Sequence, residues 1–154
     1  MAIRCGVREA RSAPAGRRLH GGMVSVRRAR ILVVDDEDFV RSLIVDILTD
    51  LGHQVDAASS GAEALRRCKQ MRYDLIVSDL RMPKIDGAAL FQALRDNYGP
   101  AMPRMIFVTG QAHSLDYACV LGIAGVPVLA KPFTVDGLQK VVSQTLRTEG
   151  PTRD

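Results

Sequence analysis

The sequence predicts an α/β protein built on one parallel sheet of five strands with helices on both faces. Five short apolar runs alternate with segments of helical periodicity, and short loops join them. The length of 154 residues and the 47% share of hydrophobic residues suit a single core. No apolar stretch approaches the roughly 20 residues needed to cross a bilayer. We therefore expect one domain and no membrane insertion.

Two strand–helix units open the pattern. Residues 31–34 are a continuous apolar run rich in β-branched side chains, which is typical of a strand buried on both faces. The helix that follows is stopped by Gly52, and its apolar face consists of Val40, Leu43, Ile44, Ile47, Leu48 and Leu51. Residues 53–58 are predicted to form a second strand. One of the two serines after it is expected to cap a helix over residues 61–71.

Three further units complete the alternation. Strands are predicted at residues 75–77, 105–108 and 126–130. Helices are predicted around residues 90–94, more weakly over residues 114–121, and finally over residues 135–147. Residues 80–87 contain a proline and an Asp-Gly pair, which indicate a loop. Residues 149–154 are expected to be a short C-terminal tail.

The positive charge of the chain is concentrated at its beginning. The net charge of +4 would by itself suggest a nucleic-acid binder. Residues 1–30, however, carry eight arginines and one acid, a net charge of +7, while the remaining residues carry a net charge of −3. We therefore expect a mildly acidic folded part without a specific nucleic-acid surface.

Residues 1–27 are rich in Arg, Gly, Ala and Ser, lack apolar periodicity and are expected to be a disordered tail. Three interpretations stay open. In the first, the tail has no function, as a passive extension or as the product of a start codon upstream of Met23. In the second, it is an electrostatic arm for nucleic acid or anionic lipid. In the third, it is an Arg-rich organellar targeting peptide. The absence of an apolar segment after the basic residues excludes a secretory signal, and we expect a cytoplasmic protein.

The cysteines and histidines show no pattern of a metal or redox site. The three cysteines are odd in number and lack ligand spacing. We interpret Cys68 and Cys119 as small buried hydrophobic residues. We interpret His20, His53 and His113 as surface or structural residues.

Distinctive polar residues lie at the carboxyl ends of four predicted strands. They are Asp35 and Asp36 after the first strand, Asp79 after the third, Thr109 after the fourth and Lys131 after the fifth. In an open α/β sheet these ends share one edge, where ligands bind. We therefore expect the five side chains to meet in one crevice.

Three carboxylates in one crevice require a cation. Two unit charges about 4 Å apart repel each other by about 4 kcal/mol at an effective dielectric constant near 20. Oxygen ligands and a partly hydrated site favour Mg²⁺ over zinc or copper. Lys131 adds one positive charge, Thr109 a hydroxyl donor and Gly110 an unobstructed backbone N–H. The crevice therefore suits a phosphoryl group bound to a carboxylate, with metal and ammonium sharing its oxygens.

Four blocks of sequence stand in order on the predicted strands, at residues 32–37, 78–87, 108–110 and 130–133. Their sequences are Leu-Val-Val-Asp-Asp-Glu, Ser-Asp-Leu-Arg-Met-Pro-Lys-Ile-Asp-Gly, Val-Thr-Gly and Ala-Lys-Pro-Phe. In these blocks the chain resembles the response-regulator receiver domain of two-component signalling, over about residues 28–148. The resemblance implies a flavodoxin-like, doubly wound (βα)5 fold with strand order 2-1-3-4-5.

The resemblance also implies roles for the matched residues. Asp79 would accept a phosphoryl group from a phosphohistidine of a histidine kinase or a histidine phosphotransfer protein. Asp36 would bind Mg²⁺ directly and Asp35 directly or through a water, and Asp79 and the backbone carbonyl of Arg81 would complete the protein's ligands. Thr109 would move toward the phosphoryl group. Lys131, which precedes a prolyl bond expected to be cis, would pair with that group.

Two departures from the family pattern affect the expected switch. Val128 stands where receivers commonly carry Tyr or Phe, so coupling is expected through Thr109 and the loop after it. Arg81 and Gln111 occupy variable positions that tune phosphate lifetime in the family. Whether the Arg81 guanidinium hinders or aims the hydrolytic water stays open.

Phe39 falls roughly 100° from Val40 around the first helix, outside its apolar face. Two interpretations are open for this aromatic ring. It contacts the helices of a partner that carries phosphohistidine, or it packs at the edge of the core.

The leading hypothesis is a stand-alone receiver, a monomer or weak dimer that switches protein contacts and catalyses only its own phosphorylation and slow dephosphorylation. The alternative within the family is a degenerate receiver or scaffold that signals without stable phosphorylation. An aspartyl phosphatase would need a second acid where Arg81 stands. A dinucleotide-binding module would need a glycine-rich turn after the first strand, and a specific DNA-binding regulator would need a helix-turn-helix beyond Arg147.

Overall fold

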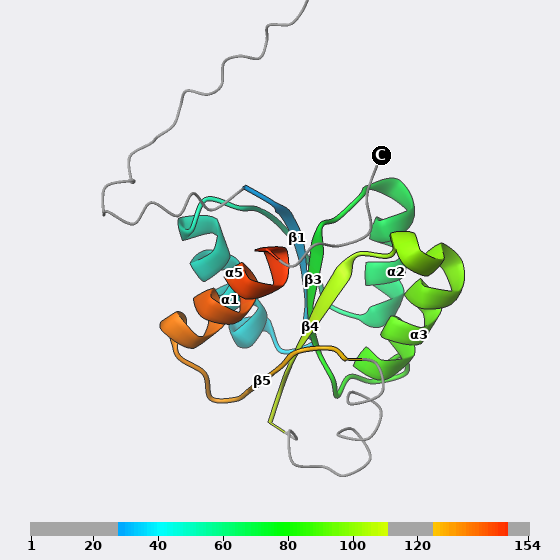
Figure 1. The fold of residues 1–154 in the computed structure, drawn as a ribbon. Helices are drawn as coiled ribbons and strands as arrows, with labels where there is room; N and C mark the ends of the chain where they lie inside the picture. The colour runs from blue at the N-terminus through cyan, green and yellow to red at the C-terminus, as the bar shows by residue number, and fades with distance from the viewer. Residues whose placement is uncertain (1–27, 111–124, 148–154) are drawn as a thin grey trace, which may run out of the picture.

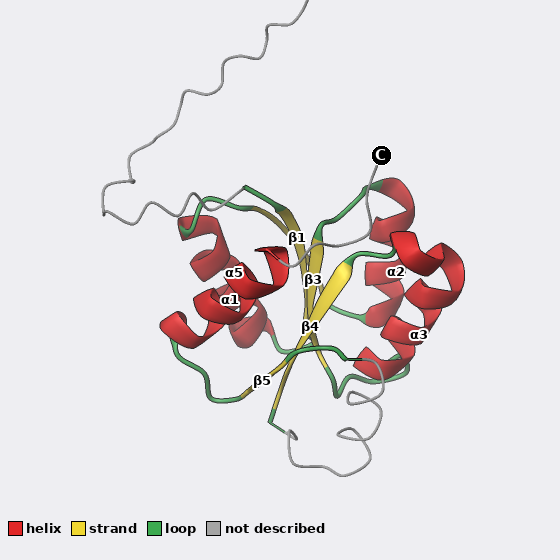
Figure 2. Ribbon diagram, in the orientation of Figure 1, coloured by secondary structure: helices red, strands yellow, loops and turns green. Residues whose placement is uncertain are grey.

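The described part of the chain comprises residues 28–110 and 125–147 of the computed structural model, and strands alternate with helices along it (Figure 2). The strands are β1 (Arg30–Val34), β2 (Gln54–Ala58), β3 (Leu75–Asp79), β4 (Arg104–Thr109) and β5 (Val128–Ala130). The helices are α1 (Asp38–Asp50), α2 (Gly61–Gln70), α3 (Gly87–Tyr98), the short 3-10 helix η3 (Gly99–Ala101) and α5 (Val135–Arg147). The predicted tails, the weaker helix at residues 114–121, and His20, His113, Gln111 and Cys119 lie outside the described residues.

All strand pairs are parallel, and the sheet has the order β2-β1-β3-β4-β5. This confirms the predicted fold class and strand order. The chain starts in the interior of the sheet, winds outward to β2, and then returns past β1 to build β3, β4 and β5 in sequence. The winding direction reverses between β1 and β3, and in such sheets a ligand crevice opens at that point, outside the carboxyl ends of the strands.

Two helical layers cover the sheet, with α1 and α5 on one face and α2 and α3 on the other (Figure 1). Successive side chains of a strand point to opposite faces, so β1 contributes to both layers. Ile31 and Val33 pack with the α1–α5 side, whereas Leu32 and Val34 pack with the α2–α3 side. This two-sided burial explains why residues 31–34 lack a polar–apolar alternation.

Local side-chain bonds fix the starts of two helices near the carboxyl edge of the sheet. Ser60 accepts the backbone N–H of Glu63 at 3.1 Å, and the Glu63 carboxylate accepts the backbone N–H of Ser59 at 2.9 Å. Asp86 accepts the backbone N–H of Ala89 at 2.9 Å at the start of α3. These caps satisfy amides that a helix leaves without partners, as the serine pair had predicted for α2.

The structure differs from the sequence prediction at Leu43 and at the start of the last strand. Leu43, assigned to the apolar face of α1, is 40% exposed, because the sheet covers the stripe formed by Ile44, Ile47 and Leu48. The last strand begins at Val128 rather than at residue 126, because Pro127 has no N–H to donate to a ladder. The Pro127 carbonyl still accepts the Phe107 N–H at 3.0 Å.

Two side chains away from the strand ends have structural roles. His53 is buried, and its Nδ1 accepts the backbone N–H of Ala29 at 3.1 Å, which ties the entry of β1 to the turn before β2. Burial lowers the pKa of this histidine, so it remains neutral and able to accept. Cys68, which was expected to be buried, is half-buried because it packs at the edge of the core on the α2–α3 side. Desolvation raises the pKa of its thiol to about 11. No helix in the described ranges is long and apolar enough to span a membrane.

Gly87 allows the loop after β3 to fold back onto the end of that strand. Its N–H donates to the Leu80 carbonyl at 2.9 Å. A Cβ at this position would lie 2.5 Å from the Asp79 carbonyl oxygen and 2.9 Å from the Phe107 ring. Only glycine leaves room for this close approach.

We predict that Gly87→Ala lowers the free energy of unfolding by about 1–3 kcal/mol, because the methyl group overpacks the backbone of Asp79. Urea unfolding measures the change. The matched control is Gly110→Ala, whose added Cβ would meet no described atom within 4 Å and should change stability by less than about 0.5 kcal/mol. Equal losses in the two variants would contradict the packing argument.

Candidate functional site

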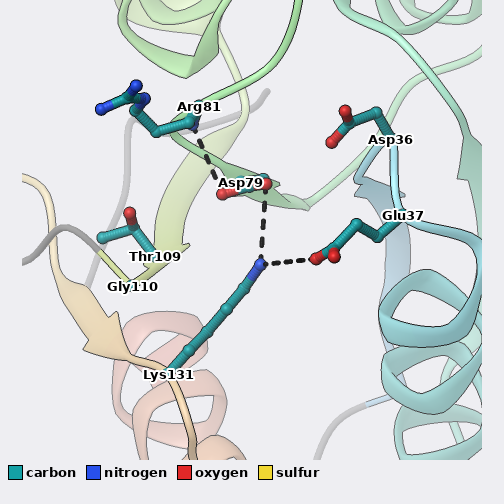
Figure 3. Close-up of a pocket in the computed structure, with 7 residues that line it drawn as sticks. All are labelled: Asp36, Glu37, Asp79, Arg81, Thr109, Gly110 and Lys131. Carbon is teal, nitrogen blue, oxygen red and sulfur yellow. Dashed lines mark hydrogen bonds and ion pairs between the residues drawn. The ribbon is translucent and has the colours of Figure 1, made fainter.

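The carboxyl edge of the sheet holds an open cavity of about 390 Å³. Its lining residues are Asp36, Glu37, Asp79, Arg81, Thr109, Gly110 and Lys131 (Figure 3). Asp79 and Thr109 are the last residues of β3 and β4, and Lys131 directly follows β5. The sequence had predicted that these strand ends would meet, and the structure brings all of them together with Asp36 in one cavity.

Asp35 lies in the loop that joins β1 to α1 and is 1% exposed. Its backbone N–H donates to the Ala58 carbonyl at 3.2 Å, and its Oδ1 accepts the Glu37 N–H at 2.9 Å. Among the residues that the structure describes, its Oδ2 has no hydrogen-bond partner and forms only an ion pair with Lys131, at 3.5 Å. A buried carboxylate oxygen without a hydrogen-bond partner is available to bind a cation.

The donor set around that oxygen suits a hard divalent cation. Asp35, Asp36 and Asp79 each offer a carboxylate oxygen, and the three oxygens lie within 4.8 Å of one another. Asp36 is exposed while the other two are buried, so the group combines fixed ligands with access to water. All-oxygen, partly hydrated sites of this kind fit Mg²⁺. The backbone of Arg81 lies against the same group, since its N–H donates to Asp79 Oδ1 at 3.4 Å.

The Lys131 ammonium stands opposite the acids. Its Nζ lies 3.5 Å from Asp35 Oδ2, 3.6 Å from Asp79 Oδ2 and 3.6 Å from Glu37 Oε1. Its backbone N–H donates to the Thr109 carbonyl at 2.9 Å, and the bond to Pro132 is cis, as the resemblance had implied. Burial opposes the charged form of this lysine, but the surrounding carboxylates outweigh it and raise its pKa.

The two buried carboxylates carry an electrostatic cost. Desolvation raises the pKa of Asp79, and the neighbouring Asp35 charge raises it further, while Lys131 acts in the opposite direction. Desolvation likewise raises the pKa of Asp35 against the bond from the Glu37 N–H and the charge of Lys131. The cluster is therefore short of positive charge.

Two residues that shape the site, Glu37 and Arg41, had no role predicted from the sequence pattern. Glu37 contributes the third carboxylate around Lys131. Arg41 donates to the Asp35 carbonyl at 2.7 Å and pairs with Asp38 at 2.6 Å, which holds the acid loop against α1. The spacing of Asp38 and Arg41, three residues apart on a helix, was the available signal. The hydrogen bond from Arg41 to the Asp35 carbonyl could be seen only in the structure.

Phe39 and Val128 lie near this edge in different environments. Phe39, in the first turn of α1, is 78% exposed, which contradicts its interpretation as a residue packed at the edge of the core. Val128 is half-buried, pairs in register with Phe107 and packs against the core on the α2–α3 side. The loop after Gly110, through which coupling is expected, lies outside the described residues.

Fold and site together define a class of α/β protein in which an acid cluster and an opposing lysine meet at the carboxyl edge of a five-stranded parallel sheet. The sequence profile of the response regulator receiver domain matches residues 31–143. The chain therefore belongs to the response-regulator receiver family, a family of phosphoacceptor modules in two-component signalling that are not conventional enzymes.

Individual relatives agree with this assignment. The chain is 31% identical over 121 residues to a probable chemotaxis protein CheY of Rhizobium etli, covering 78% of this chain and 94% of that one. It is 37% identical over 116 residues to the sensor histidine kinase RcsC of Escherichia coli, covering 75% of this chain but 12% of that one. The solved structure of the response regulator TrrA from Thermotoga maritima superposes with a TM-score of 0.67 at 32% identity, covering 75% of this chain and 97% of that one.

We predict that Asp79→Asn, measured without divalent cations, raises the free energy of unfolding at pH 7 by about 1 kcal/mol, because it removes a buried carboxylate charge. A carboxyl group whose pKa is higher in the folded than in the unfolded state binds a proton on folding. The wild-type protein therefore gains stability as the pH falls from neutral through the raised pKa, and the advantage of the variant shrinks.

Urea unfolding of both proteins at pH 7 and at pH 5 tests this prediction. A variant less stable than the wild type at pH 7 would mean that attraction to Lys131 outweighs the cost of burying the Asp79 charge.

Proposed function

We propose that this receiver accepts a phosphoryl group on Asp79 from a phosphohistidine of a histidine kinase or a histidine phosphotransfer protein, with Mg²⁺ bound by Asp35, Asp36, Asp79 and the Arg81 carbonyl. The observation that carries the proposal is the meeting of three carboxylates within 4.8 Å of one another with a lysine 3.6 Å from Asp79. TrrA, whose structure superposes on this chain, was solved in complex with Mg²⁺ and a beryllium fluoride.

In the proposed reaction, the phosphoryl group passes from the imidazole nitrogen of a phosphohistidine to a carboxylate oxygen of Asp79. An Asp79 carboxylate oxygen attacks phosphorus, the P–N bond of the phosphohistidine breaks, and the imidazole nitrogen leaves with the electron pair. Asp79 becomes a mixed anhydride. A bound Mg²⁺ would neutralise charge on the phosphoryl oxygens during this step.

The chain's own groups bind and orient the transferred group. Lys131 is already aimed at Asp79, so its ammonium reaches a phosphoryl oxygen by a small movement of a flexible side chain. Thr109 supplies a hydroxyl and Gly110 an open backbone approach at the end of β4. Lys131 and Thr109 also join β5 to β4 through their backbones, so their movement would alter that edge of the sheet. With Val128 in β5, this coupling operates without an aromatic switch.

We do not expect this protein to hydrolyse other phosphorylated molecules. The position two residues after Asp79 holds Arg81, whose guanidinium cannot protonate a leaving group near neutral pH. Figure 3 shows the Arg81 side chain directed away from Lys131, at the rim of the cavity. Slow loss of the phosphoryl group to water is the only hydrolysis expected.

The exposed ring of Phe39 is the proposed contact for the phosphohistidine-bearing partner. It stands one helical turn from Leu43, which is also exposed, so α1 presents two neighbouring apolar side chains to solvent. The helix begins three residues after Asp35, which places this pair beside the acid loop. A helical partner that docks there would bring its phosphohistidine close to Asp79.

We predict that the protein becomes labelled by acetyl phosphate only when Mg²⁺ is present, and that Asp79→Asn abolishes the labelling. Intact-mass spectrometry would show a gain of one phosphoryl group. Labelling at another residue, or no labelling with Mg²⁺, would favour the degenerate receiver.

We predict that Phe39→Ala slows transfer from a phosphohistidine partner about tenfold, a loss of about 1.4 kcal/mol of apolar contact, while labelling by acetyl phosphate stays unchanged. Stopped-flow or quench measurements of transfer give the rate. Met71→Ala is the control, because Met71 is exposed at the end of α2 that leads into the start of β3, away from the site. An unchanged transfer rate in Phe39→Ala would refute the contact.

A further inference from the structure

Three carboxylates share the single ammonium of Lys131. The distances from Nζ to Asp35, Asp79 and Glu37 fall between 3.5 and 3.6 Å, so none of the three acids holds the lysine alone. Figure 3 shows the lysine side chain extended across the cavity, with Glu37 beside it and Asp79 ahead of it. The ammonium therefore lies almost equally far from the three carboxylates.

Glu37 differs from the other two acids in its exposure and in lying outside the group of possible metal ligands. Its side chain is 63% exposed, whereas those of Asp35 and Asp79 are 1% and 8% exposed. It is not one of the three residues whose oxygens gather for a metal. Only its backbone N–H supports that group, through the bond to Asp35 Oδ1, and this bond does not depend on the side chain. Of the three described carboxylates around Lys131, Glu37 is thus the one that can leave without disturbing the metal site.

We propose that the Glu37 carboxylate is a tethered competitor for the phosphoryl oxygens: it holds Lys131 from the solvent side before phosphorylation and must release it when the phosphoryl group arrives. The proposal rests on the function proposed above and assigns Glu37 a regulatory position within it. Two consequences follow. The carboxylate keeps Lys131 oriented in the resting protein, and it slows phosphorylation because its charge opposes the incoming anion and occupies its counter-ion.

The transfer step shows where the competition acts. With acetyl phosphate as donor, an Asp79 oxygen forms a bond to phosphorus, the bond from phosphorus to the bridging oxygen breaks, and acetate leaves with the electron pair. No proton moves. A phosphoryl oxygen that accepts from Lys131 competes with the carboxylates around Nζ, and Glu37 is the exposed one of the three. Removing the Glu37 charge therefore favours the phosphorylated state.

The test compares acetyl phosphate labelling rates of the wild type, Glu37→Gln and Asp46→Asn at saturating Mg²⁺, so that changes in metal affinity do not enter. Glu37→Gln keeps the size of the side chain and removes its charge. We expect labelling about threefold faster than in the wild type, the scale of an exposed ion pair, and a difference that shrinks at high salt. Asp46→Asn removes an equal charge from an exposed position on α1 that forms no ion pair with Lys131, and should leave the rate unchanged.

A second measurement does not depend on turnover. The concentration of beryllium fluoride that half-saturates the rise in unfolding temperature, with Mg²⁺ present, should be about threefold lower for Glu37→Gln than for the wild type. Equal rates and equal half-saturation would overturn the role of Glu37 while leaving Asp79 as the acceptor. A similar acceleration in Asp46→Asn would replace the competition with a general charge effect. A wild type that is never labelled would remove the proposed function itself.

Discussion

Two buried carboxylates opposed by one ammonium are the constraint on which the rest of the structure depends. Asp35 and Asp79 are taken out of water at the carboxyl edge of the sheet, and burial raises the pKa of both. Lys131 compensates only part of this cost, since a third carboxylate, Glu37, shares it. Isolated buried charges are too costly to keep without partners. The charges of the folded site are therefore compatible with the binding of a cation by the carboxylates.

The scaffold holds this unfavourable arrangement in place through backbone contacts. Parallel strands end together, and β1 and β3 are neighbours, so Asp35 and Asp79 are forced into proximity by the ladder itself. Arg41 fixes the acid loop from α1, and Gly87 lets the following loop close over β3. The free energy that keeps the charges together comes from the two apolar layers rather than from the site.

The residues of the site fall into a buried group and an exposed group. Asp35, Asp79 and Thr109 are buried and positioned by strands, whereas Glu37 and Phe39 lie on the solvent side. In the proposed function, the buried groups set the geometry of phosphoryl transfer, because packing leaves them few alternative rotamers. Exposed groups can exchange partners at little cost, which suits the roles proposed for Glu37 in releasing Lys131 and for Phe39 in contacting a partner.

The sequence by itself determined the order of elements, the strand ends that meet and the identity of the acid cluster. It could do so because apolar runs of strand length and polar residues directly after them are local signals, and parallel topology then fixes which ends share an edge. Only the tertiary structure decided that Leu43 is exposed, that Arg41 binds the Asp35 carbonyl and that Glu37 shares Lys131. These facts depend on how a helix is rotated against the sheet and where long side chains end, and neither is encoded in residue spacing alone.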